Sequence, residues 1–163
     1  MDSIAISTNG AEGTNSVAAM LAPQLRAGDV VLLKGGLATG KTTFVKAAAA
    51  ALGAQATVTS PTFTLAQFYP YESGTILHVD TYRLSGIREY RDLGLDDYID
   101  ESITFIEWGD KVEEDFSGYL SVELHCDSSA PDLRVIAFSS SDPRWQPVIE
   151  TLQAALLDET KLG

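Results

Sequence analysis

The segment at residues 35–42 constrains this chain more than any other part of its sequence. It reads G-G-L-A-T-G-K-T and fits the pattern G-x-x-x-x-G-K-[ST]. Small residues let backbone N–H groups converge on phosphate oxygens, and the helix that follows points its N-terminus at the same phosphates. Lys41 is expected to reach the β- and γ-phosphates, and the hydroxyl of Thr42 to complete the shell of a Mg²⁺ ion. The residues expected to shape the loop around the phosphates are Gly35, Ala38, Thr39 and Gly40.

The sequence around this loop supplies the strand and the helix that the pattern requires. Residues 30–33 form a short apolar run typical of a buried strand, and the Ala-rich residues 41–52 predict a helix that ends at Gly53. Further strands are predicted at residues 63–69, 75–79, 103–106, 120–124 and 133–138. Further helices are predicted at 18–25 after Thr14 as N-cap, at 87–93, at 96–99, and at 143–157 after Asp142 as N-cap.

This alternation of strands and helices predicts an α/β fold. We expect a single P-loop NTPase-like domain over residues 1–163, built on a mixed sheet with a parallel centre flanked by helices. In such sheets ligands bind at the carboxyl ends of the strands. The phosphate loop should therefore lie at that edge.

Two acids stand where strands of this sheet are expected to end. Asp80 and Glu107 each follow an apolar run directly. An acid at the end of a neighbouring strand can hold Mg²⁺, directly or through water, or orient the attacking water. Between the loop helix and the Asp80 strand, Ser60 and Thr62 flank a proline, where nucleotidases often carry a segment that senses the γ-phosphate.

Composition narrows the classes of function. The 163 residues carry 23 acidic and 11 basic side chains, a net charge of −12, so we do not expect broad nucleic-acid binding by this chain alone. There is one cysteine, Cys126, which excludes an internal disulfide and fits a reducing compartment. The sequence shows neither an apolar run of membrane-spanning length nor a signal region, so we expect a cytoplasmic protein that does not associate with membranes.

Several segments together resemble the TsaE family, the small P-loop ATPases of bacterial threonylcarbamoyladenosine synthesis on tRNA. After the loop come S-P-T-F-T-L at residues 60–65, H-V-D-T-Y-R-L at 78–84, L-G-L-D-D-Y at 93–98 and I-E-W at 106–108. The P-loop alone is shared by many families, whereas this later set is specific. The resemblance covers residues 35–108, about half of the chain.

The resemblance implies a Mg²⁺-dependent ATPase, slow on its own, that binds ATP or ADP at the sheet edge. It also implies partners, homologues of TsaB and TsaD, through which the chain would meet tRNA only indirectly. Carried over by residue, Lys41 and Thr43 would bind phosphates, Thr42 and Glu107 would bind Mg²⁺, and Asp80 would support the metal or the water. Trp108 would lie near the nucleotide or the partner, and Ser60 and Thr62 in a switch-like loop. Further nucleotide contacts would come from Thr14 and Arg134.

The loop itself departs from the family. The usual pattern is G-D-L-G-A-G-K-T-T, where this chain reads G-G-L-A-T-G-K-T-T, so that Gly36, Ala38 and Thr39 are unusual. If position 38 requires a positive φ, its Cβ costs about 1 kcal/mol or more. Two alternatives therefore stay open. One is a small-molecule P-loop kinase, and the other is a binding module that nucleotide orders without turnover.

Overall fold

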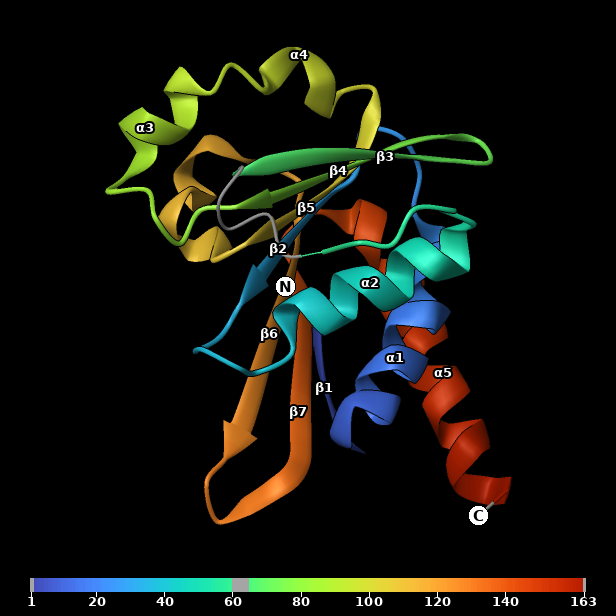
Figure 1. Ribbon diagram of the computed structural model, residues 1–163. Coiled ribbons are helices and arrows are strands. Elements are labelled where there is room, and N and C mark those ends of the chain that lie inside the picture. Colours follow the sequence, from blue (N-terminus) through green and yellow to red (C-terminus); the bar gives the residue numbers. More distant parts are fainter. Residues whose placement is uncertain (1, 60–64, 163) are drawn as a thin grey trace.

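A computed structural model describes residues 2–59 and 65–162 of the chain. Within these residues seven strands form one sheet, flanked by helices (Figure 1). The strands are β1 (Asp2–Asn9), β2 (Val30–Lys34), β3 (Ala66–Tyr71), β4 (Gly74–Asp80), β5 (Ser102–Glu107), β6 (Leu120–Asp127) and β7 (Ala130–Ser140). The α-helices are α1 (Gly10–Leu21), α2 (Lys41–Leu52), α3 (Ile87–Asp92), α4 (Asp96–Ile99) and α5 (Gln146–Leu162). Short 3₁₀ turns are η1 (Ala22–Gln24), η2 (Gly109–Lys111), η3 (Glu113–Asp115) and η4 (Pro143–Trp145).

The sheet is mixed, with its parallel strands in the centre. The strand order is β1-β7-β6-β2-β5-β4-β3. β2 pairs in parallel with β5 and β6, and β4 pairs in parallel with β5, whereas the β3–β4, β6–β7 and β1–β7 pairs are antiparallel. The predicted α/β fold with a parallel centre is therefore confirmed.

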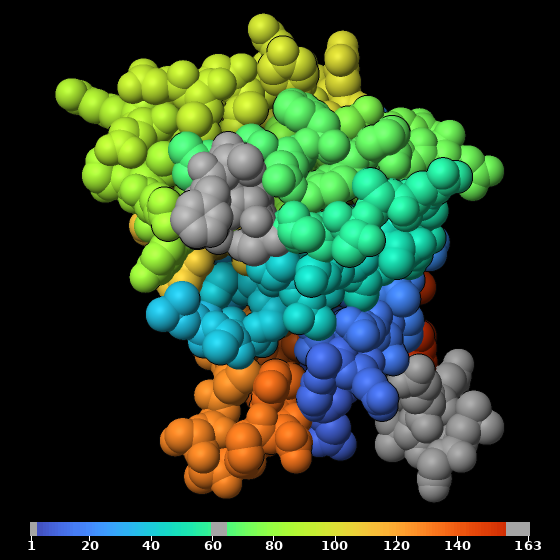
Figure 2. Space-filling model, viewed as in Figure 1, coloured from blue at the N-terminus to red at the C-terminus, as the bar shows by residue number. Residues whose placement is uncertain are grey.

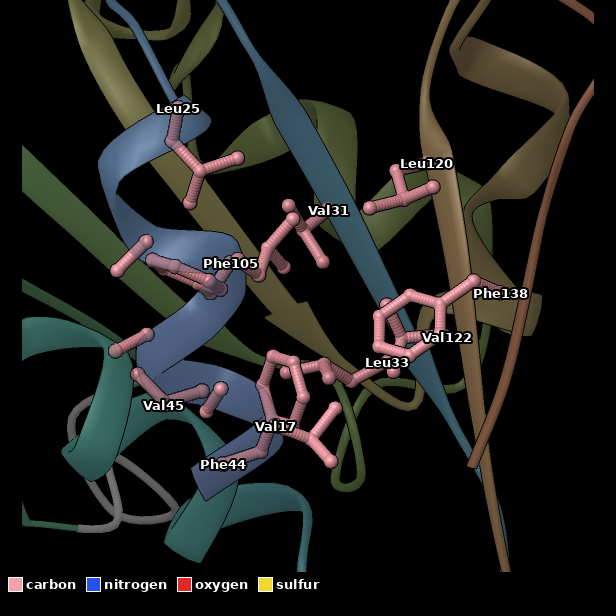
Figure 3. Close-up of a cluster of buried hydrophobic side chains, with 14 of the residues drawn as sticks. Val17, Leu25, Val31, Leu33, Phe44, Val45, Phe105, Leu120, Val122 and Phe138 are labelled. Atoms are coloured by element: carbon pink, nitrogen blue, oxygen red, sulfur yellow. The ribbon is translucent and has the colours of Figure 1, made fainter. Parts of the chain in front are cut away.

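The central strands bury both faces, because their side chains alternate between two apolar clusters. On β2, Val31 and Leu33 join the larger cluster, and Val30 and Leu32 join the smaller one. The larger cluster packs α1, α2 and α5 against one face, and Figure 3 shows Val17, Phe44 and Val45 of α1 and α2 facing the strands. The smaller cluster includes residues of α3 and α4 on the other face. This arrangement holds α2 directly over the central strands.

The start of the chain differs from the prediction. Residues 2–9 form the edge strand β1, which the sequence did not predict, paired along its full length with β7. Helix α1 then begins at Gly10, and Thr14 lies inside it, with its hydroxyl donating to the Gly10 carbonyl at 3.4 Å. The prediction that Thr14 is an N-cap is therefore wrong. Asp142, by contrast, accepts the Arg144 amide at 2.9 Å and caps η4 at the start of the last helical segment.

The other boundaries shift by a few residues. The β3–β4 hairpin forms where it was predicted, although β3 begins at Ala66 and residues 63–64 lie outside the described part. β6 and β7 extend further toward their turn than expected. In the described part of the chain no helix combines the length and apolarity needed to cross a bilayer.

Candidate functional site

Three neighbouring strands end together at the carboxyl edge of the sheet. Asp80, the last residue of β4, is in register with Glu107, the last residue of β5, and Glu107 is in turn beside Leu33 of β2. The chain leaves β2 into the P-loop (residues 35–40) and enters α2 at Lys41. Parallel pairing therefore brings the loop and both predicted acids to one place, although they are far apart in the sequence.

The backbone of the P-loop takes conformations that favour glycine. Gly35 has φ 137°, and a Cβ there would stand 2.4 Å from the Leu124 carbonyl of β6, so no other residue fits. Gly40 has φ 106° and leads into α2. Ala38 has φ 58° in the same left-handed region, where its Cβ is strained. Position 38 therefore has the positive φ on which the predicted energetic cost of its Cβ depends. The Thr39 hydroxyl stabilises the loop by donating to the Gly36 carbonyl at 2.9 Å.

The ammonium group of Lys41 is held inside this loop. Nζ donates to the carbonyls of Gly35 at 2.9 Å and Gly36 at 2.5 Å, and it lies 4.0 Å from the centre of the Trp108 ring. Lys41 is 5% exposed. Burial lowers its pKa below the usual 10.5, and the carboxylates of Glu107 and Asp80 act in the opposite direction. The site thus holds a confined cation at the mouth of the loop.

Glu107 is the centre of a short chain of polar contacts under the N-terminus of α2. Thr42 donates its hydroxyl to both carboxylate oxygens of Glu107, at 2.8 Å to Oε1 and 2.9 Å to Oε2. His78 of β4 brings Nε2 to 2.6 Å from the same Oε2. Glu107 is 3% exposed and His78 is fully buried. A carboxyl group withdrawn from water in this way needs such partners to replace the hydrogen bonds of the lost water.

The segment after β4 forms the wall of the site. Asp80 accepts the backbone N–H of Tyr82 at 2.9 Å, and Thr81 donates its hydroxyl to the carbonyls of Glu107 and Trp108 at 3.0 and 2.9 Å. Lys111 donates to three carbonyls of the segment at residues 81–84. The rings of Tyr82 and Trp108 lie 5.0 Å apart. These contacts seat Trp108 over Lys41.

These elements enclose a pocket of about 380 Å³. It is lined by residues 37–43 of the loop and α2, and by Asp80, Tyr82, Glu107 and Trp108. In Figure 2 the loop (sky blue) projects at the edge of the molecule above the β6–β7 hairpin (orange), and Leu37 at its tip is 70% exposed. The pocket therefore opens directly to solvent beside the loop.

The donor set suits Mg²⁺ completed by a ligand's oxygens rather than a closed metal cage. Hydroxyl and carboxylate oxygens, the ligands Mg²⁺ prefers, converge in Thr42 and Glu107, with Asp80 beside them. Within residues 2–59 and 65–162 no three His, Cys, Asp or Glu side chains gather as a metal site. This matches the usual binding of Mg²⁺ through one or two carboxylates plus phosphate oxygens.

The remaining predicted residues lie at different distances from the pocket. Thr14 of α1 is buried beside Gly40, since a Cβ built on Gly40 would be 3.9 Å from the Thr14 hydroxyl, but it is not among the residues that line the pocket. Arg134 lies on β7 opposite Cys126, and its guanidinium donates to the carbonyls of Pro131 and Leu133. It is not among the residues that line the pocket. Ser60 and Thr62 lie outside the described residues, so their expected switch role stays a prediction.

Comparison with known proteins shows the family of the chain. The family model described as "Threonylcarbamoyl adenosine biosynthesis protein TsaE" matches residues 8–134, most of the chain, including every pocket residue. The chain belongs to the TsaE family. Its match extends well beyond the P-loop, through both strand-end acids and as far as Arg134.

Relatives named as TsaE align over most of their length. The protein named "tRNA threonylcarbamoyladenosine biosynthesis protein TsaE" from Streptomyces coelicolor is 39% identical over 131 residues, 77% of this chain and 88% of that protein. The protein of the same name from Bacillus subtilis is 34% identical over 142 residues, 86% of this chain and 88% of the other. The crystal structure of Bacillus subtilis YdiB superposes with a TM-score of 0.73 at 28% identity, covering 94% of this chain and 96% of that one.

Two residues of this TsaE-family site escaped the sequence analysis. His78 entered the sequence analysis only as part of the H-V-D-T-Y-R-L segment, and the structure shows that its ring contacts Glu107. The available signal was that His78 and Asp80 share one face of their strand, two residues apart. Lys111 carried no signal, because its three carbonyl partners lie 27 to 30 residues away in the sequence.

Proposed function

We propose that this chain binds ATP with Mg²⁺ in the P-loop pocket and hydrolyses it slowly, as part of threonylcarbamoyladenosine synthesis on tRNA. The single observation that carries the proposal is the contact of Thr42 with both oxygens of Glu107 at the N-terminus of α2. It pairs a hydroxyl and a carboxylate where a phosphate-bound Mg²⁺ would need them. The role in tRNA modification rests on family membership.

In this proposal the loop and the start of α2 hold the nucleotide. The backbone N–H groups of residues 38–43 and the helix N-terminus would bind the phosphates. Lys41 would exchange the Gly35 and Gly36 carbonyls for phosphate oxygens, which bear full negative charge and bind an ammonium more strongly. Trp108, already against Lys41, would then lie beside the terminal phosphates. Thr14 and Arg134 stay candidates for contacts with the rest of the nucleotide.

Hydrolysis requires a water molecule to attack the γ-phosphorus while the bond to the ADP oxygen breaks, releasing ADP and inorganic phosphate. Thr42 and Glu107 would hold Mg²⁺, which when bound neutralises charge on the β- and γ-phosphate oxygens. Asp80, in register with Glu107 and buried at the pocket wall, would support the metal or orient the water. Lys41 would stabilise negative charge that shifts onto the leaving phosphate oxygen.

The partners would be homologues of TsaB and TsaD, and tRNA would be met through that complex. The net charge of −12 supports this division, because an acidic chain contributes little to phosphate-backbone binding. The same charge would speed encounter with a basic face of a protein partner. These reactions belong to the cytoplasm, where we place the chain.

Reconstitution tests the proposal. TsaB and TsaD from the same source would be supplied with tRNA, ATP, an activated threonylcarbamoyl donor and this chain, and threonylcarbamoyladenosine in the tRNA would be measured. We expect wild type to restore modification and Lys41→Ala to fail. Restoration by Lys41→Ala as well as by wild type would show that modification does not need phosphate binding by Lys41. Restoration by wild type with no ATP turnover would favour the nucleotide-ordered binding module.

A further inference from the structure

Glu107 depends on its neighbours for its position. It ends β5, but its carboxylate turns under α2 and is almost fully buried. Among the described residues its side-chain hydrogen-bond partners are the Thr42 hydroxyl and the His78 ring. In the proposed site the Thr42 oxygen would also offer a lone pair to Mg²⁺, so Thr42 would serve the metal as well as Glu107. His78 has no such second duty.

The strand geometry gives His78 a fixed direction. It lies on β4 in register with Phe105, two residues before Asp80, in the parallel centre of the sheet. Alternation directs its side chain to the same face as Ile76 and Phe105, which belong to the cluster under α2. The ring is fully buried and reaches Oε2 of Glu107 at 2.6 Å. A side chain packed on a central strand is a more rigid support than one on a loop.

The contact with a carboxylate indicates which nitrogen of the His78 ring carries the hydrogen. An ionised carboxylate only accepts hydrogen bonds, so the ring must present N–H at Nε2 toward Glu107. Nδ1 is then the atom without a proton, and it has no hydrogen-bond partner among the described residues. A ring with its hydrogen on Nε2 leaves no donor unsatisfied in the core, which suits a structural hydrogen bond to Oε2.

We propose that His78 is a positioning residue for the Mg²⁺ site: its Nε2–H holds Oε2 of Glu107, so that the carboxylate stays directed at Thr42 and the P-loop. The inference rests on the proposed function, since it needs Glu107 to be a metal ligand. It predicts that His78 affects the affinity for Mg²⁺ with nucleotide, and leaves metal-free nucleotide binding at the loop nearly unchanged. Groups that orient metal ligands commonly change metal affinity by about 10- to 100-fold.

The test is calorimetric and needs no turnover. The dissociation constant of ADP would be measured in EDTA and in saturating Mg²⁺ for wild type, His78→Leu and His78→Gln. The dissociation constant in EDTA divided by that in Mg²⁺ gives the coupling between Mg²⁺ and nucleotide binding. We expect His78→Leu to lower this ratio about 10-fold, with the EDTA constant within about twofold of wild type. His78→Gln, whose amide N–H reaches the place of Nε2, should keep most of the ratio.

Thr104→Val is the matched control. Thr104 is a fully buried polar residue on β5 that faces the other side of the sheet, so its loss tests generic damage to the core. It should leave the ratio at the wild-type value. Melting by circular dichroism confirms that each variant is folded. If His78→Leu does not fold, His78→Asn replaces it, because the shorter amide cannot reach Glu107 and should lose coupling that His78→Gln retains.

Three results would overturn the inference. The first is an unchanged ratio in His78→Leu or, where it is used, in His78→Asn. The second is an equal loss of affinity with and without Mg²⁺, which indicates a structural role only. The third is loss of the ratio in Thr104→Val as well. Failure of the underlying proposal has a different signature, because wild type itself would then show no effect of Mg²⁺ on ADP affinity.

Discussion

At the scale of single residues, Ala38 has the clearest energetic consequence. Its φ of 58° places a Cβ in the left-handed region, within a loop that must meet a ligand through its backbone. Strained backbone is retained at functional sites when the surrounding structure holds it in place. Here the Thr39–Gly36 hydrogen bond and the close approach of Gly35 to β6 provide that support.

We therefore predict that Ala38→Gly stabilises the protein. Relief of the strained Cβ outweighs the extra entropy of glycine in the unfolded chain, so the free energy of unfolding should rise by about 0.5–1 kcal/mol. Urea denaturation measures this. The control is Leu37→Gly, because Leu37 is exposed and has no positive φ. It should be neutral or destabilising. An equal rise in the free energy of unfolding in Leu37→Gly and Ala38→Gly would contradict the claim that the Ala38 backbone is strained.

Site residues that belong to a local sequence pattern were predictable, whereas contacts between residues distant in the sequence were not. The P-loop pattern carries its own spacing, and Asp80 and Glu107 directly follow the strands that deliver them. The His78–Glu107 contact joins residues 29 positions apart. Which face of β4 lies under α2 depends on packing, so the alternation of side chains alone could not reveal the partner.

At the scale of elements, the segment at residues 81–84 depends on Lys111. Nζ of Lys111 lies 2.7 to 3.3 Å from the carbonyls of Thr81, Tyr82 and Leu84, and 5.6 Å from the centre of the Tyr82 ring. Tyr82 packs on Trp108, which covers Lys41. One lysine from η2 thus orders the wall of the pocket through the backbone of another segment.

Removal of this lysine should weaken both the fold and the site. In Lys111→Met the three carbonyls lose a charged donor, and we expect the free energy of unfolding to fall by about 1–2 kcal/mol. ADP affinity should fall with it, because Trp108 and Tyr82 lose their support. Denaturation and calorimetry give the two readouts. Lys46→Met, on the exposed surface of α2, is the matched control. Equal behaviour of the two variants would contradict the role of Lys111.

A second element-level contact sits where β2 enters the P-loop. Lys34 pairs with Glu113 at 2.7 Å, and Tyr119 donates to the same carboxylate. The hydrogen bonds from Lys34 and Tyr119 hold the pKa of Glu113 below the usual 4.5, while burial and Glu113 raise the pKa of Tyr119 to about 12. A lowered carboxyl pKa means that the contact stabilises the fold above pH 4.5 and loses this effect as pH falls through the folded value.

A double-mutant cycle of Lys34→Met and Glu113→Gln measures this contact against pH. Because the pair is partly exposed, we expect a coupling of only about 0.5 kcal/mol near neutral pH. The coupling should disappear as the pH drops below the folded pKa of Glu113, which lies under 4.5. Coupling that persists unchanged in acid, or that grows there, is incompatible with an ionised Glu113 as the partner of Lys34.

Elements with strong local patterns were predicted with near-correct bounds, as α2 and β5 show. β1 was missed because residues 2–9 alternate weakly, and this strand is specified by its partner β7 at the other end of the chain. Helix α1 begins four residues before the predicted cap, because a glycine with φ 58° supplies the turn from strand into helix. Tertiary pairing, which no local pattern records, decides such positions.

At the scale of the whole molecule, the negative net charge disfavours direct binding of this chain to tRNA. A net charge of −12 opposes association with a polyanion. The 11 Lys and Arg residues of the chain are scattered along the sequence, so the sequence predicts no basic patch. We predict that the chain alone binds tRNA with a dissociation constant weaker than about 100 μM at physiological salt. Filter binding with labelled tRNA measures this. Micromolar binding by the chain alone would contradict a tRNA contact made only through partners.

The central claim is that residues from three strand ends and one helix form a Mg²⁺-dependent ATPase site. The most direct measurement is phosphate release from ATP by wild type, Lys41→Ala and Glu107→Gln, with and without Mg²⁺, alone and with TsaB and TsaD. We predict slow release by wild type that requires Mg²⁺ and changes with the partners, and a loss of at least about 10-fold in each variant. No release by wild type under any condition, or release that neither substitution alters, would contradict the account.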